Sequence, residues 1–133
     1  MGSLVLWGGG IPIDRSGPSN AVEQVAAFFK RQRNVILVIS PEGARKKTSH
    51  WRSGFYYMAQ ASGVPIVMGA LDYRHKRVHL GDLLVPSGNI EADMDIIRAF
   101  YTRVRANGKF PENAGEIRLR SEIEAEHAPE TPA

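Results

Sequence analysis

The chain has 133 residues, of which 43% are hydrophobic, and it contains no cysteine. This composition predicts one globular domain with an apolar core, and it excludes disulfide bonds, thiolate metal sites and a cysteine nucleophile. Residues 1–111 carry 15 basic and 8 acidic side chains, whereas residues 112–133 carry 2 basic and 6 acidic ones. The basic body is therefore expected to attract anions such as phosphates, acidic lipids or nucleic acid.

The N-terminal part of the chain predicts a strand, a helix and a second strand. The first strand is short and apolar, over residues 10–13, and the helix follows Pro18. Asn20, with Glu23 three positions later, matches a capping box at the start of this helix. The side chains at helical spacing that should face the core are Val22, Val25, Ala26 and Phe29. Residues 35–40 are nearly all apolar and rich in β-branched side chains, which predicts a buried strand.

The middle of the chain predicts a helix followed by a hairpin. A second helix is expected over residues 53–61, with Gly63 in the position of a left-handed cap. Residues 64–72 are mostly apolar and predict the next strand. The polar tripeptide at residues 74–76 predicts the tip of a hairpin, and residues 78–80 predict its short returning strand.

A long helix is expected next, over residues 91–105, with Asn89 as its cap and Gly108 closing it. Its apolar stripe consists of Met94, Ile97, Tyr101 and Val104. The acidic segment beyond it predicts a flexible, solvated tail over residues 111–133, in which a frayed helix over residues 117–127 can form.

The order of these elements, β-α-β-α-β-β-α, predicts an α/β fold. We expect a mixed, mostly parallel sheet flanked by helices. Residues 1–110 are expected to form this domain, and residues 111–133 the acidic tail.

Two polar clusters follow predicted strands, at the edge where open α/β sheets bind ligands. Their members are Asp14, Arg15 and Ser16 in the first cluster, and Glu42, Gly43 and Arg45 in the second. An arginine can direct two N–H groups at one phosphate, and a glycine lets the backbone approach a ligand closely. Each cluster therefore has two interpretations: a phosphate site, or a tight turn with a surface ion pair.

Other catalytic patterns are not found. The basic run at residues 45–52, which includes His50, is either a solvated loop or a further anion-binding segment. No pair of histidines has metal-ligand spacing with a third ligand, so no metal site is expected. The chain has no phosphate-binding P-loop and no nucleophile elbow. The glycines at residues 8–10 precede a predicted strand, which argues against a dinucleotide fingerprint.

Four blocks of sequence occur in the order and spacing of a known family. They are residues 9–16 (Gly-Gly-Ile-Pro-Ile-Asp-Arg-Ser), 41–45 (Pro-Glu-Gly-Ala-Arg), 51–55 (Trp-Arg-Ser-Gly-Phe) and 64–67 (Val-Pro-Ile-Val). Residues 9–16, 41–45 and 64–67 resemble the second, third and fourth conserved blocks of the 1-acyl-glycerol-3-phosphate (lysophosphatidic acid) acyltransferases, and residues 51–55 resemble the aromatic-basic-x-Gly segment that follows the third block. The resemblance extends over roughly residues 8–75.

The resemblance implies a glycerol-3-phosphate acyltransferase-like fold and a role in phospholipid biosynthesis. Family members transfer a fatty acyl group from acyl-CoA or acyl-carrier protein to a glycerophosphate hydroxyl, and this thioester is a substrate, so no cofactor is implied. By motif position, Arg15 and Arg45 would hold the acceptor phosphate, and Glu42 and Gly43 would shape its glycerol pocket. Secondary contacts would come from Asp14, Ser16 and Arg52. The implied location is cytoplasmic, at the inner face of an anionic membrane.

The first block of the family is a histidine followed five positions later by an aspartate, and no such pair occurs in these residues. In the family, this histidine is the general base on the acceptor hydroxyl, and the aspartate orients it. The domain is therefore expected to be N-terminally incomplete, and we assign no catalytic residue. The chain alone is expected to be inactive.

Two alternatives remain beside an incomplete acyltransferase. The chain could be a catalytically dead remnant that binds glycerophosphate or anionic lipid. The other is a basic nucleic-acid module, but no nucleic-acid partner is expected, because no aromatic residues are interleaved with the basic ones as single-strand binding requires. An incomplete sheet would leave an edge uncovered, and this predicts self-association.

Overall fold

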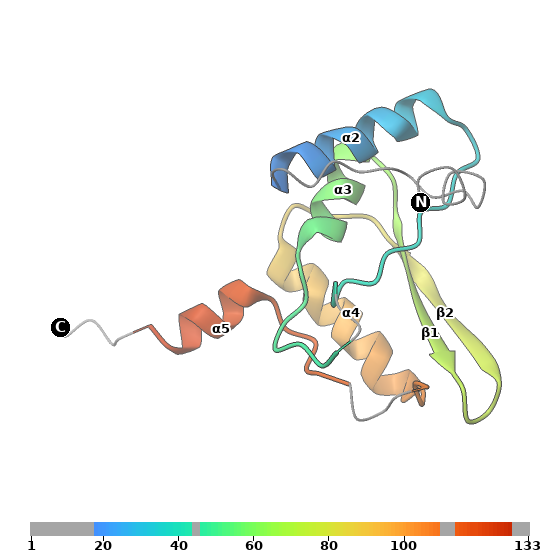
Figure 1. The fold of residues 1–133 in the computed structure, drawn as a ribbon, viewed down its shortest axis with the longest axis vertical. Coiled ribbons are helices and arrows are strands. Elements are labelled where there is room, and N and C mark those ends of the chain that lie inside the picture. Colours follow the sequence, from blue (N-terminus) through green and yellow to red (C-terminus); the bar gives the residue numbers. More distant parts are fainter. Residues whose placement is uncertain (1–17, 44–45, 110–113, 129–133) are drawn as a thin grey trace.

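The computed structural model describes residues 18–43, 46–109 and 114–128. Its elements are α2 (Pro18–Arg31), α3 (Gly54–Ser62), β1 (Ile66–Asp72), β2 (Arg77–Leu84), α4 (Ile90–Val104) and α5 (Arg120–Glu126). Helix α2 packs on α3, and α4 packs against the β1–β2 hairpin, while α5 projects from the body (Figure 1). The described part of the chain is therefore a mixed α/β structure.

Helix α2 forms where the apolar spacing predicts it, and Val25 is fully buried on its inner face. The helix begins at Pro18, however, so that Asn20 lies within the helix and the predicted capping box is wrong. Proline suits a first turn because the N–H group that it lacks would have no partner inside the helix. Two cations, Lys30 and Arg31, occupy the last turn, where they complement the helix dipole.

Helix α3 ends as predicted. Gly63 follows it in the left-handed conformation, with φ 65° and ψ 32°, and its N–H group donates to carbonyl oxygens at the end of the helix. A glycine adopts this conformation without the steric cost of a Cβ atom.

The sheet differs from the prediction. It consists of β1 and β2, which pair antiparallel, and the only parallel pairing among the described residues is an isolated bridge between Trp51 and Leu119. The expectation of a mostly parallel sheet is therefore wrong for these residues. The predicted hairpin forms, and its strands run antiparallel because a short turn joins them. Residues 35–40, which were expected to supply a parallel neighbour, join no sheet of the described residues. Strand β2 is also longer than predicted, since it extends to Leu84.

Residues 35–40 do not form the predicted buried strand. They join no sheet of the described residues, and the side chains of Ile36 and Val38 are 91% and 88% exposed. An apolar β-branched run favours extended backbone, but a strand also needs a neighbouring strand, which the local pattern does not specify. The uncovered segment is compatible with the predicted self-association, which stays a prediction.

Helix α4 is capped as predicted, because the Asn89 side chain accepts a hydrogen bond of 3.2 Å from the Ala92 N–H group. Its C-terminal end differs from the prediction. Arg105 adopts the left-handed conformation (φ 47°) and donates its N–H group to the Tyr101 carbonyl, so that the helix ends before Gly108.

The core lies between the hairpin and α4. Its buried members are Trp51, Met68, Ala70, Leu84, Met94, Ile97, Phe100 and Leu119. Gly81 of β2 is needed for this packing, because a Cβ atom there would lie 2.9 Å from Met68 and 3.0 Å from the Phe100 ring. The alternation of inward and outward side chains along β1 therefore places one face of the hairpin on α4.

The segment after α4 contacts this core. The Trp51 N–H group donates to the Arg118 carbonyl at 2.7 Å, and Leu119 is buried. Arg98 of α4 donates to the Ile117 carbonyl at 3.0 Å and pairs with Glu122 of α5. The division of the chain at residue 110 stays a prediction.

Candidate functional site

Glu42 and Gly43 of the second predicted cluster lie in a tight turn. The Gly43 N–H group donates to the Ser40 carbonyl at 3.2 Å, and the Ser40 hydroxyl donates to the Glu42 carboxylate at 2.6 Å. Gly43 has φ +64°, which a residue with a Cβ atom adopts only at a cost. The turn therefore holds the Glu42 carboxylate, and Gly43 leaves room above its backbone that a Cβ atom would fill.

Arg52 crosses this turn. Its N–H group donates to the Pro41 carbonyl at 2.8 Å, and a Cβ atom on Gly43 would lie 2.8 Å from the Arg52 Nε atom. Position 43 therefore requires glycine for two reasons: its φ angle is positive, and a Cβ atom would collide with the Arg52 guanidinium group. Among the described residues, no carboxylate lies within ion-pair distance of Arg52, so that this exposed cation can accept an anion.

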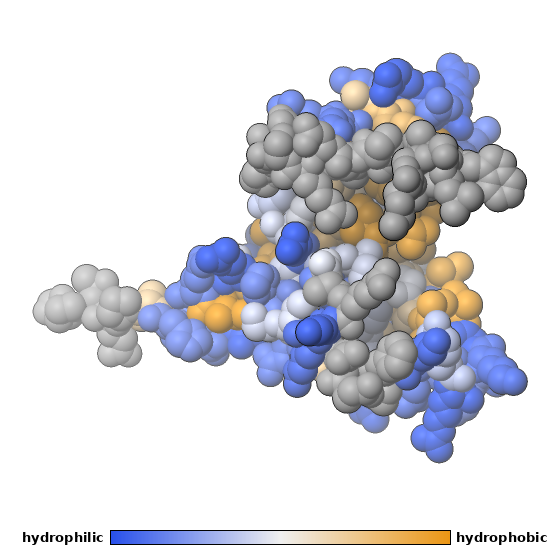
Figure 2. Space-filling model, in the orientation of Figure 1, coloured by the Kyte–Doolittle hydropathy of each residue, from blue (hydrophilic) through white to orange (hydrophobic). Residues whose placement is uncertain are grey.

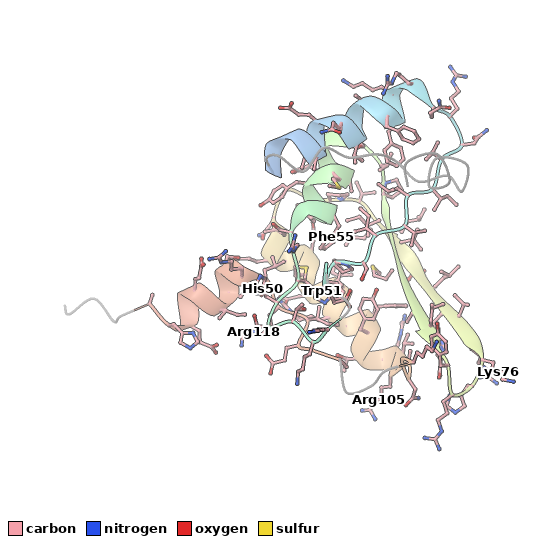
Figure 3. All side chains as sticks on the ribbon, viewed as in Figure 1. His50, Trp51, Phe55, Lys76, Arg105 and Arg118 are labelled. Atoms are coloured by element: carbon pink, nitrogen blue, oxygen red, sulfur yellow. The ribbon has the colours of Figure 1, made fainter. Side chains whose placement is uncertain are left out.

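An aromatic cluster supports the segment that carries Arg52. Trp51 is buried, and its ring meets Tyr101 and Phe55 edge to face, with centroid distances of 5.6 Å and 6.1 Å. Trp51 and Phe55 lie together on this segment in Figure 3. Such edge-to-face pairs add stability beyond the buried area. The structure places Trp51 in the hydrophobic core.

Tyr101 connects the cluster to strand β1. Its hydroxyl donates to the Gly69 carbonyl at 3.0 Å, and burial raises its pKa, an effect to which the negative charge of Glu42 adds. The Glu42 carboxylate, which accepts a hydrogen bond from the Ser40 hydroxyl, can also accept one from a substrate hydroxyl.

The predicted site residues divide into two sets. The structure brings Glu42, Gly43 and Arg52 together. The remaining predicted residues, namely Asp14, Arg15, Ser16 and Arg45, lie outside the described residues. The proposed phosphate contacts of Arg15 and Arg45 therefore stay predictions.

The loop after the turn adds positive charge. Lys46 and Lys47 are exposed, and His50 approaches the Ser49 hydroxyl, with 3.0 Å between Nδ1 and Oγ. Lys46 and Lys47 lie between the Gly43 turn and the Arg52 segment in the sequence, so they increase the positive potential near the site.

Neither a metal site nor a membrane span is found in the described part of the chain. No group of three or more histidine, aspartate or glutamate side chains there could hold a metal ion. Among these residues, no helix is long and apolar enough to cross a bilayer.

Comparison with known proteins supports the resemblance in part. Over 80 residues the chain is 34% identical to a Cocos nucifera protein named 1-acyl-sn-glycerol-3-phosphate acyltransferase. The matched region covers 56% of this chain and 26% of that protein, so the chain corresponds to about a quarter of the relative's length. No family model matches the chain, and no solved structure matches it significantly. The similarity suggests an acyltransferase-type function at the level of the family.

A buried polar network near the N-terminus of α4 was not predicted from the sequence. The Asp93 carboxylate accepts hydrogen bonds from the Tyr56 hydroxyl (2.7 Å), the Ser87 N–H group (2.8 Å) and the Ser87 hydroxyl (2.9 Å). The Gly88 N–H group donates to the Tyr56 hydroxyl at 3.0 Å. Burial favours the neutral acid, but the donors of Ser87 and Tyr56 outweigh it and lower the pKa of Asp93. The network joins α3 to the start of α4.

A second buried carboxylate lies at the hairpin tip. Asp72 accepts hydrogen bonds from the His75 ring at 2.8 Å and from the His75 N–H group at 3.2 Å. The hydrogen bond from the His75 ring lowers the pKa of Asp72 to about 2 against the effect of burial, and the backbone of His75 and Asn107 contributes in the same direction. This carboxylate thus fixes the turn between β1 and β2 and joins it to the segment that follows α4.

The Asp72 carboxylate gives the hairpin a predicted pH dependence. Because the pKa of Asp72 is lower in the folded state, its contribution to stability is complete above about pH 4 and is lost as the pH falls toward about 2. Asp72→Asn is expected to be less stable than the parent chain at neutral pH. It should also lose less stability than the parent chain does as the pH falls from about 4 to about 2. Urea unfolding at stepped pH measures both effects. Asp82→Asn, which changes an exposed carboxylate of the same hairpin, is the matched control. If the free energy of unfolding of Asp72→Asn fell with pH as steeply as that of the parent chain, the account would be contradicted.

Proposed function

We propose that this chain is the acceptor-binding part of a glycerolipid acyltransferase. The reaction of the whole protein would transfer a fatty acyl group from acyl-CoA or acyl-carrier protein to a lysophosphatidic-acid-like glycerophosphate. The observation that carries the proposal is the close approach of the Arg52 guanidinium to the Gly43 backbone. It joins two of the sequence blocks that resemble the family, and the partial match to the Cocos nucifera acyltransferase supports it further.

Each residue of the proposed site has a distinct task. Arg45 and Arg15 bind the acceptor phosphate, because a guanidinium matches two phosphate oxygens at once. Arg52, which has no ion-pair partner among the described residues, adds a third cation at the Gly43 turn. Glu42 accepts a hydrogen bond from a glycerol hydroxyl, and this orients the glycerol relative to its phosphate.

Binding without catalysis is the expected behaviour of these 133 residues. None of the four histidines is followed five positions later by an aspartate, so the general base that the family uses is not among them. This observation also favours a second candidate, a glycerophosphate- or anionic-lipid-binding protein without transfer activity. Acylation of lysophosphatidic acid by the purified chain with a thioester donor would contradict both.

Titration with glycerol phosphate in solution tests the acceptor site. We expect saturable binding, with amide chemical shift changes concentrated at residues 41–53. Inorganic phosphate should bind more weakly, because it has no glycerol hydroxyl group that can donate a hydrogen bond to the Glu42 carboxylate. Chemical shift changes spread evenly over the basic surface, or equal affinity for both anions, would contradict a specific glycerophosphate site.

In the cell, we propose a cytoplasmic location with peripheral contact to the membrane.

A further inference from the structure

One face of the β1–β2 hairpin is apolar and exposed. Its side chains, which point away from α4, are Val67 and Leu71 of β1 and Val78, Leu80 and Leu83 of β2. Each of them is between 49% and 72% exposed. The register places Val67 opposite Leu83 and Leu71 opposite Val78, so the five side chains form one continuous surface, the outer hairpin face. A continuous exposed apolar surface of this kind is typical of an interaction site.

The tip of the same hairpin is cationic. Arg74, Lys76 and Arg77 are all exposed, and the turn between the strands contains no carboxylate with which they could pair. Asp72, which ends β1, is buried and hydrogen-bonded to the His75 ring. Figure 2 shows apolar side chains beside hydrophilic ones on this side of the molecule, and Lys76 marks the tip in Figure 3.

We propose that the outer hairpin face docks on an anionic lipid bilayer. The five apolar side chains enter the boundary between headgroups and acyl chains, and the three tip cations bind lipid phosphates. The proposal deepens the function proposed above and rests on it for the lipid nature of the acceptor. Docking through the hairpin would hold the Gly43 turn near a bilayer that contains this acceptor.

Charge favours a bilayer over a second copy of the chain. In a symmetric pair the same surface meets itself, and the tip cations then need carboxylates within that surface. The hairpin has one exposed carboxylate, Asp82, which lies toward the other end of β2 from the tip. Lipid phosphates, in contrast, supply negative charge along the whole rim of the docked face.

Sedimentation with lipid vesicles tests the docking. Vesicles of phosphatidylglycerol and phosphatidylcholine should bind the chain, pure phosphatidylcholine should bind it more weakly, and added salt should weaken binding to the anionic vesicles. Because each cation near an anionic surface contributes about five-fold to partitioning, Arg74→Glu with Arg77→Glu should reduce binding by about 25-fold or more. Leu71→Asp with Leu80→Asp should reduce it at least about ten-fold, since two apolar side chains leave the membrane boundary.

Controls separate docking from misfolding and from acceptor binding. Ile96→Asp changes an exposed apolar residue of α4 and should bind vesicles like the parent chain. Thermal unfolding checks every variant, and Leu80→Ser replaces the double aspartate variant if the latter does not fold. Glycerol phosphate in solution should bind the hairpin variants normally. If the parent chain binds no glycerol phosphate but docks through the hairpin, the docking stands and the proposed function fails.

Two results would overturn the proposal. In the first, both hairpin variants bind anionic vesicles as strongly as the parent chain does. In the second, the apolar variants convert an oligomer into a monomer in analytical ultracentrifugation while vesicle binding persists. That result would assign the outer hairpin face to contacts between copies of the chain.

Discussion

Replacing Asp93 by alanine is expected to lower the free energy of unfolding by about 3 kcal/mol. The carboxylate is 3% exposed and accepts hydrogen bonds from the Tyr56 hydroxyl and from two donors of Ser87. Its removal leaves the buried Tyr56 hydroxyl without its acceptor and takes a negative charge from the first turn of α4. Urea unfolding followed by circular dichroism measures the change.

The matched control for this variant is Asp95→Ala, two positions later in the same helix. The Asp95 carboxylate is 78% exposed and pairs with Arg98 at 2.8 Å. An exposed ion pair contributes little, so this variant should lose no more than about 0.5 kcal/mol. Tyr56→Phe should lie between the two, because it removes one member of the network. Equal stability of Asp93→Ala and Asp95→Ala would show that the buried network does not join α3 to α4.

Replacing Gly43 by valine is expected to weaken glycerol phosphate binding by about ten-fold or more and to reduce stability by about 1–2 kcal/mol. The stability loss follows from φ +64°, which a β-branched residue tolerates poorly. The loss of binding has a different cause: a Cβ atom would lie 2.8 Å from the Arg52 Nε atom, so the guanidinium must move away from the turn. Titration calorimetry and urea unfolding measure the two effects separately.

Gly63→Val separates backbone strain from the loss of the Arg52 contact. Gly63 has nearly the same backbone conformation, with φ +65°, but no heavy atom lies within 4 Å of the position of its Cβ atom. Its substitution should therefore cost a similar amount of stability and leave glycerol phosphate binding unchanged. If both variants lose binding equally, the loss comes from destabilisation, and the site does not depend on the approach of Arg52.

The fold was predictable where the determining signal is local. The glycine cap at Gly63, the Asn89 cap of α4 and the hairpin tip each depend on the conformational preferences of one or a few residues. Residues 35–40 show the limit of such signals. Their composition favours extended backbone, but whether they form a strand depends on a neighbouring strand, and no local pattern specifies one.

For the candidate site, the sequence indicated the residues but not how they pack together. A polar loop after an apolar run indicated Glu42 and Gly43, and the family resemblance added Arg52. The packing of Arg52 over Gly43 depends on the path of the chain between residues 43 and 52, which spacing alone does not determine. The Asp93 network was missed because its members come from separate elements. The one available signal was an acidic residue in the first turn of a helix that follows Ser87 and Asn89.

Binding of glycerol phosphate to the parent chain, Arg45→Ala and Arg33→Ala is the most direct test of the proposed acceptor site. Arg33 is exposed just after the end of α2, so its substitution changes the net charge equally without touching the proposed site. The account predicts saturable binding to the parent chain, little change in Arg33→Ala, and a loss of about ten-fold or more in Arg45→Ala, as expected for a guanidinium that binds a phosphate through two hydrogen bonds. Equal affinities of the two variants would contradict it, because the binding would then depend on overall charge rather than on the loop at residues 41–45.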